Sequence, residues 1–278
     1  MKKLLILLIT LIIPLSSLPS AKINTYALKP PAYLAIVIDD FGMDRYGVED
    51  MLNIGVPLTC AIMPNLEYST TDSNNAHNKG HEVMLHMPME ANCYLPPNYY
   101  GPELITNYET KEGVITKINN ALKSVPHASG MNIHIGSGVS EKLGIMKNVY
   151  EEAQNHHFYF LDSATTINSK CEQASALTSS NYLRRDVFLE PHGQKSYYNA
   201  KQFILQAGQI AQTDGYAIAI GHVGPEGGIM TARAITDMLT TLKDMNVQIV
   251  PLSFIDQQLT NAQLTNKHAE KLSTITSK

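Results

Sequence analysis

Carboxylates and histidines stand at the ends of several apolar runs in this chain. The adjacent acids Asp39 and Asp40 end the first run, and His86, His134 and His222 stand at or near the ends of three later runs. Neutral imidazoles and carboxylates together form a common ligand set for divalent metals, and both groups can also transfer protons. The pattern therefore predicts a metal-dependent site if the fold brings these run ends together.

The acid pair has a second interpretation, as the N-cap of a following helix that begins within Asp-Asp-Phe-Gly-Met-Asp. We prefer the metal interpretation because two like charges side by side repel each other unless a cation or a proton separates them. A single histidine at a strand end is most often a hydrogen-bonded structural residue. His81 begins its run and is expected to be structural, whereas His192 could overhang the site.

The elements that must position these residues alternate along the chain. Strands are expected at 32–38, 56–63, 81–86, 128–135, 157–162, 182–190, 216–222 and 247–255. Helices are expected at 68–79, 110–124, 140–150, 199–213 and 231–245, with a long loop at 87–107. Such alternation predicts parallel strands joined by right-handed crossovers, so that all their carboxyl ends lie on one rim. Asp162 and Glu190 also end strands of this series. The fold class is α/β, a distorted (β/α) barrel of about seven or eight mostly parallel strands.

Length and composition fit one globular domain, which we place at 32–256. The chain has 278 residues, 44% of them hydrophobic, and its net charge of -4 argues against a nucleic-acid partner. Residues 1–27 combine two lysines, an apolar stretch and small residues, which is typical of a signal peptide or N-terminal anchor. The folded part is then exported to the periplasm or the cell exterior. Residues 257–278 form a polar C-terminal tail that we expect to fray.

The three cysteines do not make a disulfide framework. Cys60 lies in an apolar run and is expected to be buried. Cys93 and Cys171 lie in loop-like stretches and could pair in an oxidising compartment.

Six segments, taken in order and spacing, resemble one known family. They are IVIDDFG (36–42), GHEVMLHMPME (80–90), GMNIHIGS (130–137), FLDSATT (160–166), RDVFLE (185–190) and AIGHVGP (219–225). Over roughly 33–255 the chain is similar to the divergent polysaccharide deacetylases, a branch of the NodB-type carbohydrate esterases.

The resemblance implies a NodB-like barrel that holds a divalent metal, usually zinc, through one aspartate and two histidines. It makes Asp39 the general base, His222 the general acid, and Asp40, His86 and His134 the metal ligands. The implied reaction removes N-acetyl groups from an envelope or extracellular glycan. Supporting or substrate-binding roles fall to three further acids, which are Asp162, Glu190 and Glu90.

Several positions depart from the family pattern. Glu90 stands where the usual His-x-x-x-His motif has its second histidine, and His134 is expected to supply that ligand. Ile133, Ala164, Glu190 and Val223 replace the usual Asn, Arg, Asp and Pro. These departures leave two rival interpretations open. One is a catalytically weak or inactive exported protein that binds metal or glycan, and the other is a metal-dependent phosphoesterase or other amidohydrolase.

Overall fold

A computed structural model gives the fold, and it describes residues 30–276. Residues 1–27, where we predict a signal peptide or anchor, lie outside the described residues. From Pro31 onward the chain forms one compact unit. Within the described part of the chain, no helix has the length and apolar character needed to cross a membrane.

Nine strands of the described chain form one sheet in which every pairing is parallel. They are β1 (Ala32–Phe41), β2 (Thr59–Ile62), β3 (Glu82–Met89), β4 (Ala128–Ile135), β5 (Tyr159–Asp162), β6 (Leu183–Arg184), β7 (Val187–Phe188), β8 (Tyr216–His222) and β9 (Val247–Ile249). Their order is β6-β5-β4-β3-β2-β1-β8-β7, and β9 also pairs with β1. The predicted NodB-like (β/α) barrel is confirmed as a strongly curled parallel sheet.

The strand predicted at 182–190 is two strands in the structure. Strands β6 and β7 follow each other in the chain but lie at opposite edges of the sheet order. At the junction, the Arg185 amide donates to the Asp162 carbonyl of β5 at 3.0 Å. The Asp186 amide donates to the Ile218 carbonyl of β8 at 2.8 Å. One dipeptide therefore connects the two edges of the curled sheet, and neither residue can continue a single ladder.

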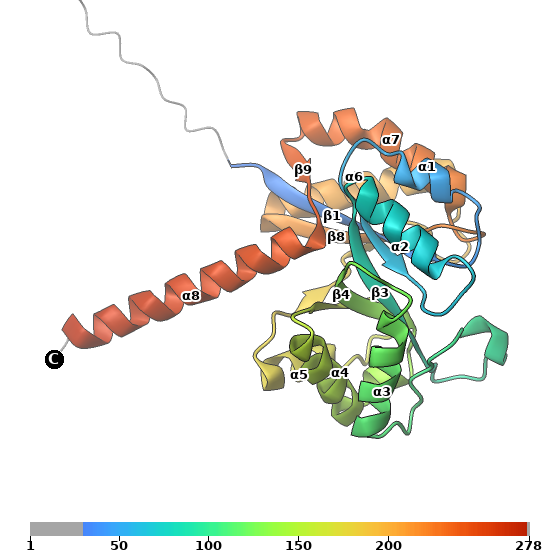
Figure 1. The fold of residues 1–278 in the computed structure, drawn as a ribbon. Helices are drawn as coiled ribbons and strands as arrows, with labels where there is room; N and C mark the ends of the chain where they lie inside the picture. The colour runs from blue at the N-terminus through green and yellow to red at the C-terminus, as the bar shows by residue number, and fades with distance from the viewer. Residues whose placement is uncertain (1–29, 277–278) are drawn as a thin grey trace, which may run out of the picture. The chain divides into compact units, whose positions relative to one another are not determined.

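The helices lie outside the sheet (Figure 1). They are α1 (Val48–Leu52), α2 (Ser69–Asn78), α3 (Lys111–Leu122), α4 (Leu143–Asn155), α5 (Cys171–Thr178), α6 (Tyr197–Asp214), α7 (Gly228–Asp244) and α8 (Leu252–Thr276), with two 3₁₀ turns at Pro97–Tyr99 and Val139–Glu141. Thr110 caps α3 by accepting a hydrogen bond from the Gly113 amide at 3.0 Å.

The C-terminal part of the chain differs from the prediction. Strand β9 ends at Ile249, and α8 begins at Leu252 instead of continuing the strand to Ile255. The first amides of α8 donate to side chains on the sheet, Leu252 to Thr59 at 3.0 Å and Ser253 to Glu82 at 3.3 Å. These bonds satisfy two of the donors that a helix start leaves unpaired. The segment that we expected to fray is helical through Thr276.

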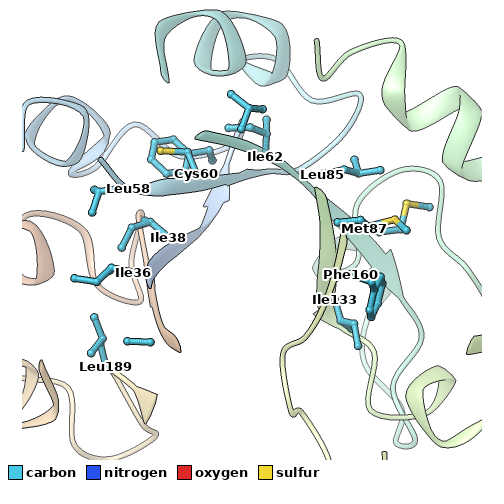
Figure 2. Packing of buried hydrophobic residues seen from close by; sticks show 14 of the residues in the cluster. Ile36, Ile38, Leu58, Cys60, Ile62, Leu85, Met87, Ile133, Phe160 and Leu189 are labelled. Carbon is cyan, nitrogen blue, oxygen red and sulfur yellow. The ribbon is translucent and has the colours of Figure 1, made fainter. Parts of the chain in front are cut away.

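Alternate residues of β1, β2, β3, β5 and β8 enter two different hydrophobic clusters. Ile36 and Ile38, with Leu85 and Met87, pack outward in a cluster that includes helix residues (Figure 2). Ala35, Val37, Met84, Ile218 and Ile220 pack on the inner side of the curled sheet. The strands are therefore buried on both faces, which explains their continuous apolar sequences.

The cysteines do not form a disulfide. Cys60 and Cys171 are buried, Cys93 is exposed, and all three are free. The pairing of Cys93 with Cys171 is thus wrong, because α5 buries the Cys171 side chain in the outer core.

Candidate metal and catalytic site

The inner face of the sheet leads directly to the predicted site. Asp39 continues the inner series of β1, two residues after Val37, and His86 follows Met84 in the same way. His222 follows Ile220 on β8, and β1 and β8 pair Asp39 with His222 in register. Because side chains alternate across a strand, all three point inward at the carboxyl end of the sheet.

Asp40 joins them because the end of β1 is irregular. Its φ of 70° is in the left-handed region, and the register between β1 and β2 shifts between Ile38 and Phe41. This irregularity turns both adjacent carboxylates toward one cleft, which a regular strand would not do. The helix N-cap interpretation is wrong here, since α1 begins later and its N-cap is Gly47.

A buried acid on α2 stabilises the turn that follows Asp40. Asp72, on α2, accepts a hydrogen bond from the Gly42 amide at 2.9 Å and pairs with Arg45. Gly42 has a φ of +101°, and a Cβ there would lie 3.0 Å from the Met63 carbonyl oxygen. Glycine and the Asp72 carboxylate together allow the tight path that positions Asp40.

Asn132 connects Asp39 to His86. Its Nδ2 donates to Oδ1 of Asp39 at 2.8 Å, so its Oδ1 must be the atom that faces Nδ1 of His86 at 2.7 Å. An amide oxygen only accepts, and Nδ1 of His86 therefore carries the proton. Nε2 of His86 then presents a lone pair to the cleft.

His134 is oriented by the same logic. Its Nε2 lies 3.0 Å from the carbonyl oxygen of Tyr99, which can only accept, so Nδ1 carries the lone pair. Nδ1 of His134 lies 3.2 Å from Oδ1 of Asp40, and Nε2 of His86 lies 3.3 Å from the same oxygen.

When both imidazoles are neutral, three electron-pair donors thus converge with no proton among them. Oδ1 of Asp40 is buried and has no hydrogen-bond partner among the described residues. The ligand atoms of Asp40, His86 and His134 all lie within 4.8 Å of one another. A buried polar atom without a partner is unfavourable, and a shared cation removes that penalty. The residues therefore fit a divalent metal, which they would hold with one oxygen and two nitrogen ligands.

The electrostatics of the cluster agree with a need for positive charge. Burial opposes the ionised form of Asp40, but the two histidines beside it outweigh burial and hold the pKa of its carboxyl well below the usual range. Burial also lowers the pKa of His86, yet the charge of Asp39 and the contact with Asp40 outweigh it, and the pKa of His86 is raised. Without a metal, protons take the place of the missing positive charge.

His222 forms a second, separate pair with Glu190. Its Nδ1 lies 3.1 Å from Oε2 of Glu190. The Glu190 side chain is buried, and its other oxygen, Oε1, accepts from the hydroxyl of Thr231. Burial lowers the pKa of His222, but the Glu190 carboxylate and the charge of Asp40 outweigh it and raise this pKa to about 9. Glu190 thus occupies Nδ1 and leaves Nε2 for contact with a ligand.

The five predicted metal-binding and catalytic side chains line one cleft. It has a volume of about 620 Å³, and Asp39, Asp40, His86, His134 and His222 are part of its wall. His192 also lines this cleft, as we considered from the sequence, whereas His81 is buried between Leu58 and Leu52 and is structural.

Three predicted supporting residues do not line the cleft, and of these only Glu190 contacts one of its catalytic candidates, His222. The strand residue Asp162 accepts bonds from the Ala164 amide and from Ser169 and Tyr182, so it organises the loop after β5. Glu90 accepts from the Asn107 amide at 2.6 Å and fastens the long loop to β3.

Two residues of the site were missed from the sequence. Asn132 stands two positions before His134, on the same face of β4, so strand alternation was the signal that could have found it. Arg185 lines the cleft at the junction of β6 and β7, where no periodic signal exists.

A sequence profile described as "Divergent polysaccharide deacetylase" matches residues 36–255, which is most of the chain. The chain belongs to this family. The divergent polysaccharide deacetylase match includes all five cleft residues named above, from Asp39 to His222.

Two bacterial relatives of this chain are described as uncharacterized proteins. The uncharacterized protein YibQ of Escherichia coli K12 is 31% identical over 211 residues, which are 75% of this chain and 63% of YibQ. An uncharacterized protein of Haemophilus influenzae is 29% identical over 194 residues, 69% of this chain and 67% of that protein. The match thus spans less than two thirds of YibQ.

Solved structures agree on the fold. An uncharacterized protein from Agrobacterium tumefaciens C58 superposes with a TM-score of 0.73 at 18% identity, covering 83% of this chain and 91% of that one. The Bc1960 peptidoglycan N-acetylglucosamine deacetylase gives a TM-score of 0.51 at 13% identity, covering 82% and 94%. At these identities the likeness concerns the fold alone.

Proposed function

We propose that this protein is a metal-dependent hydrolase that removes N-acetyl groups from an envelope or extracellular glycan. The main support for this proposal is the set of side chains that line one cleft. Three metal-ligand atoms converge there beside a carboxylate and a histidine, Asp39 and His222, that are not part of the ligand set. A site for metal binding alone needs only the first three residues.

Asp40, His86 and His134 would hold the metal, and zinc suits this set of two imidazoles and one carboxylate. When bound, such a metal supplies a Lewis acid that polarises the acetyl carbonyl and acidifies a water.

Asp39 is the proposed general base. Its Oδ1 is engaged by Asn132, and its Oδ2 lies 3.8 Å from Nε2 of His86, beside the ligand cluster. Oδ2 is therefore the atom that takes the proton of the attacking water. Asn132 keeps the carboxylate in place during this step.

His222 is the proposed general acid. Its raised pKa keeps it protonated near neutral pH, and Glu190 holds Nδ1. Nε2 then donates a proton to the sugar nitrogen as the C–N bond breaks, which gives an amine and acetate. No covalent intermediate is needed.

The proposed substrate is an N-acetylated glycan outside the cytoplasm, in keeping with the N-terminal segment that we predict to direct export. The family assignment and the fold shared with a peptidoglycan deacetylase support this substrate class.

The test is release of acetate from N-acetylglucosamine oligomers by the purified full-length protein. We expect release that stops with a chelator and returns with added zinc. Bound metal without acetate release from any N-acetylated glycan would favour the non-catalytic binding protein instead. Protein that takes up no metal would contradict the whole proposal.

A further inference from the structure

Arg185 is a fixed cation on the wall of the cleft. Its Nε donates to the carbonyl of Ser163 at 2.8 Å, and Nη2 donates to the carbonyl of Ala164 at 2.9 Å. The guanidinium also lies over the ring of Phe188, 4.8 Å from its centroid. Two backbone acceptors and an aromatic ring thus hold the group in one orientation.

This cation has no carboxylate partner. Among residues 30–265, whose side chains the structure describes, no acid lies within ion-pair distance of Arg185, although the charges of Asp39 and Asp162 act on its pKa. Both acids are engaged elsewhere, Asp39 by Asn132 and Asp162 by the loop after β5. Burial and the neighbouring Arg184 lower the pKa of Arg185, as expected for a partly desolvated cation without a counter-ion.

The donors of Arg185 are only partly used. A guanidinium has five N–H groups, and two of those on Arg185 are bonded to protein carbonyls. The remaining three have no acceptor among the described residues. A half-buried arginine normally pairs with an anion, so the missing partner is expected to come from a ligand in the cleft.

We propose that Arg185 forms a subsite for a carboxylate carried by the glycan, on or next to the N-acetylated sugar. This inference rests on the proposed function, because it takes the ligand of the cleft to be a glycan. A carboxylate is favoured over a phosphate monoester, which is close to a dianion at neutral pH, because one arginine balances one negative charge. The same cleft already contains two acids, Asp39 and Asp40, that would repel a dianion.

The subsite does not depend on the remaining basic group near the cleft. Lys195 pairs with Glu226, so neither adds a net charge to the wall. Arg184, the preceding residue, is exposed and is not part of the cleft wall, which makes it a matched control.

The experiment compares two glycan fragments of equal length by calorimetry. One is a neutral N-acetylglucosamine oligomer, and in the other the N-acetylated sugar carries a carboxylate, as in N-acetylmuramic acid. Binding is measured with the full-length, metal-loaded protein carrying Asp39→Asn, which we expect to bind without turnover. Arg185→Gln, Arg185→Lys and Arg184→Gln are each added to this background.

We expect the acidic fragment to bind about tenfold or more tightly than the neutral one, a typical effect of one charge-assisted contact. Arg185→Gln should remove this preference, with a much smaller effect on binding of the neutral fragment. Arg185→Lys should keep part of the preference, and Arg184→Gln should keep all of it. Thermal unfolding of each variant identifies any loss that comes from misfolding.

Equal binding of the two fragments by the parent protein would overturn the subsite. An Arg185→Gln variant that binds both fragments equally weakly would also overturn it, because Arg185 would then only support the Ser163–Ala164 loop. So would an Arg185→Gln variant that keeps the preference for the acidic fragment, because the metal would then be the source of that preference. These results do not depend on acetate release. Failure of the proposed hydrolysis is therefore distinguishable from failure of the subsite.

Discussion

Nδ1 of His134 lies 3.1 Å from Nε2 of His86, and both nitrogens face the cleft with lone pairs. Two lone pairs at this distance repel each other, and both are also repelled by the Oδ1 atom of Asp40, which faces them. The arrangement is favourable only with a cation between the three atoms or with additional protons. It is the physical basis of the first prediction.

Removal of one ligand should abolish metal binding. We expect Asp40→Ala and His134→Ala to lose the metal that the wild-type protein retains through gel filtration, as measured by elemental analysis. His192→Ala is the matched control, because His192 lines the same cleft but is not in the ligand set. Full metal occupancy in either ligand variant would refute the assignment.

Asp39→Asn should separate metal binding from turnover. The amide has the shape of the carboxylate but is a poor base, so acetate release should fall by roughly 10²–10⁴-fold while metal content stays the same. Asp50→Asn, an exposed acid on α1, should leave both quantities unchanged. Unchanged acetate release in Asp39→Asn would show that another group takes the proton.

Glu190→Gln should change the pH dependence through His222. The pKa of His222 is raised from 6.5 to about 9, so the protonated acid is present below that pH and lost above it. We therefore expect acetate release by the wild type to have an alkaline limb that follows the loss of the His222 proton. In Glu190→Gln it should move down by about one pH unit or more, because the charge that stabilises the imidazolium is gone.

The same pair has a predictable effect on stability. Because the folded-state pKa is raised, the stabilisation is fully present below pH 6.5 and is lost as the pH rises through about 9. NMR titration of the His222 ring gives the pKa directly and needs no turnover. Glu226→Gln is the control, since Glu226 lines the cleft but pairs with Lys195. An unchanged His222 titration in Glu190→Gln would rule out this coupling.

Asn132→Ala should weaken metal binding although Asn132 is not a ligand. The change leaves Nδ1 of His86 and Oδ1 of Asp39 buried without their partner. We expect metal affinity to fall by roughly 10–100-fold. The free energy of unfolding should fall by about 1–3 kcal/mol in denaturant titrations. The exposed Asn168→Ala serves as control, and wild-type metal affinity in Asn132→Ala would contradict the positioning role.

Much of this protein follows from its amino-acid sequence alone. Alternating apolar runs and helical stretches determine a parallel α/β barrel, because such strands need crossovers and bury both faces. Since the carboxyl ends of parallel strands share one rim, the sequence alone groups five residues, which are Asp39, Asp40, His86, His134 and His222. The structure brings all five together in one cleft.

Only the tertiary structure decided which polar side chains face that cleft. A strand buried on both faces has no alternation of polar and apolar residues, so its sequence does not tell the inner face from the outer one. For this reason Asp162 was grouped with the rim, although it organises a loop. The turn of Asp40 depends on Asp72 from another element. Arg185 reaches the cleft because β6 and β7 pair with opposite edges of the sheet, a long-range arrangement that no local pattern encodes.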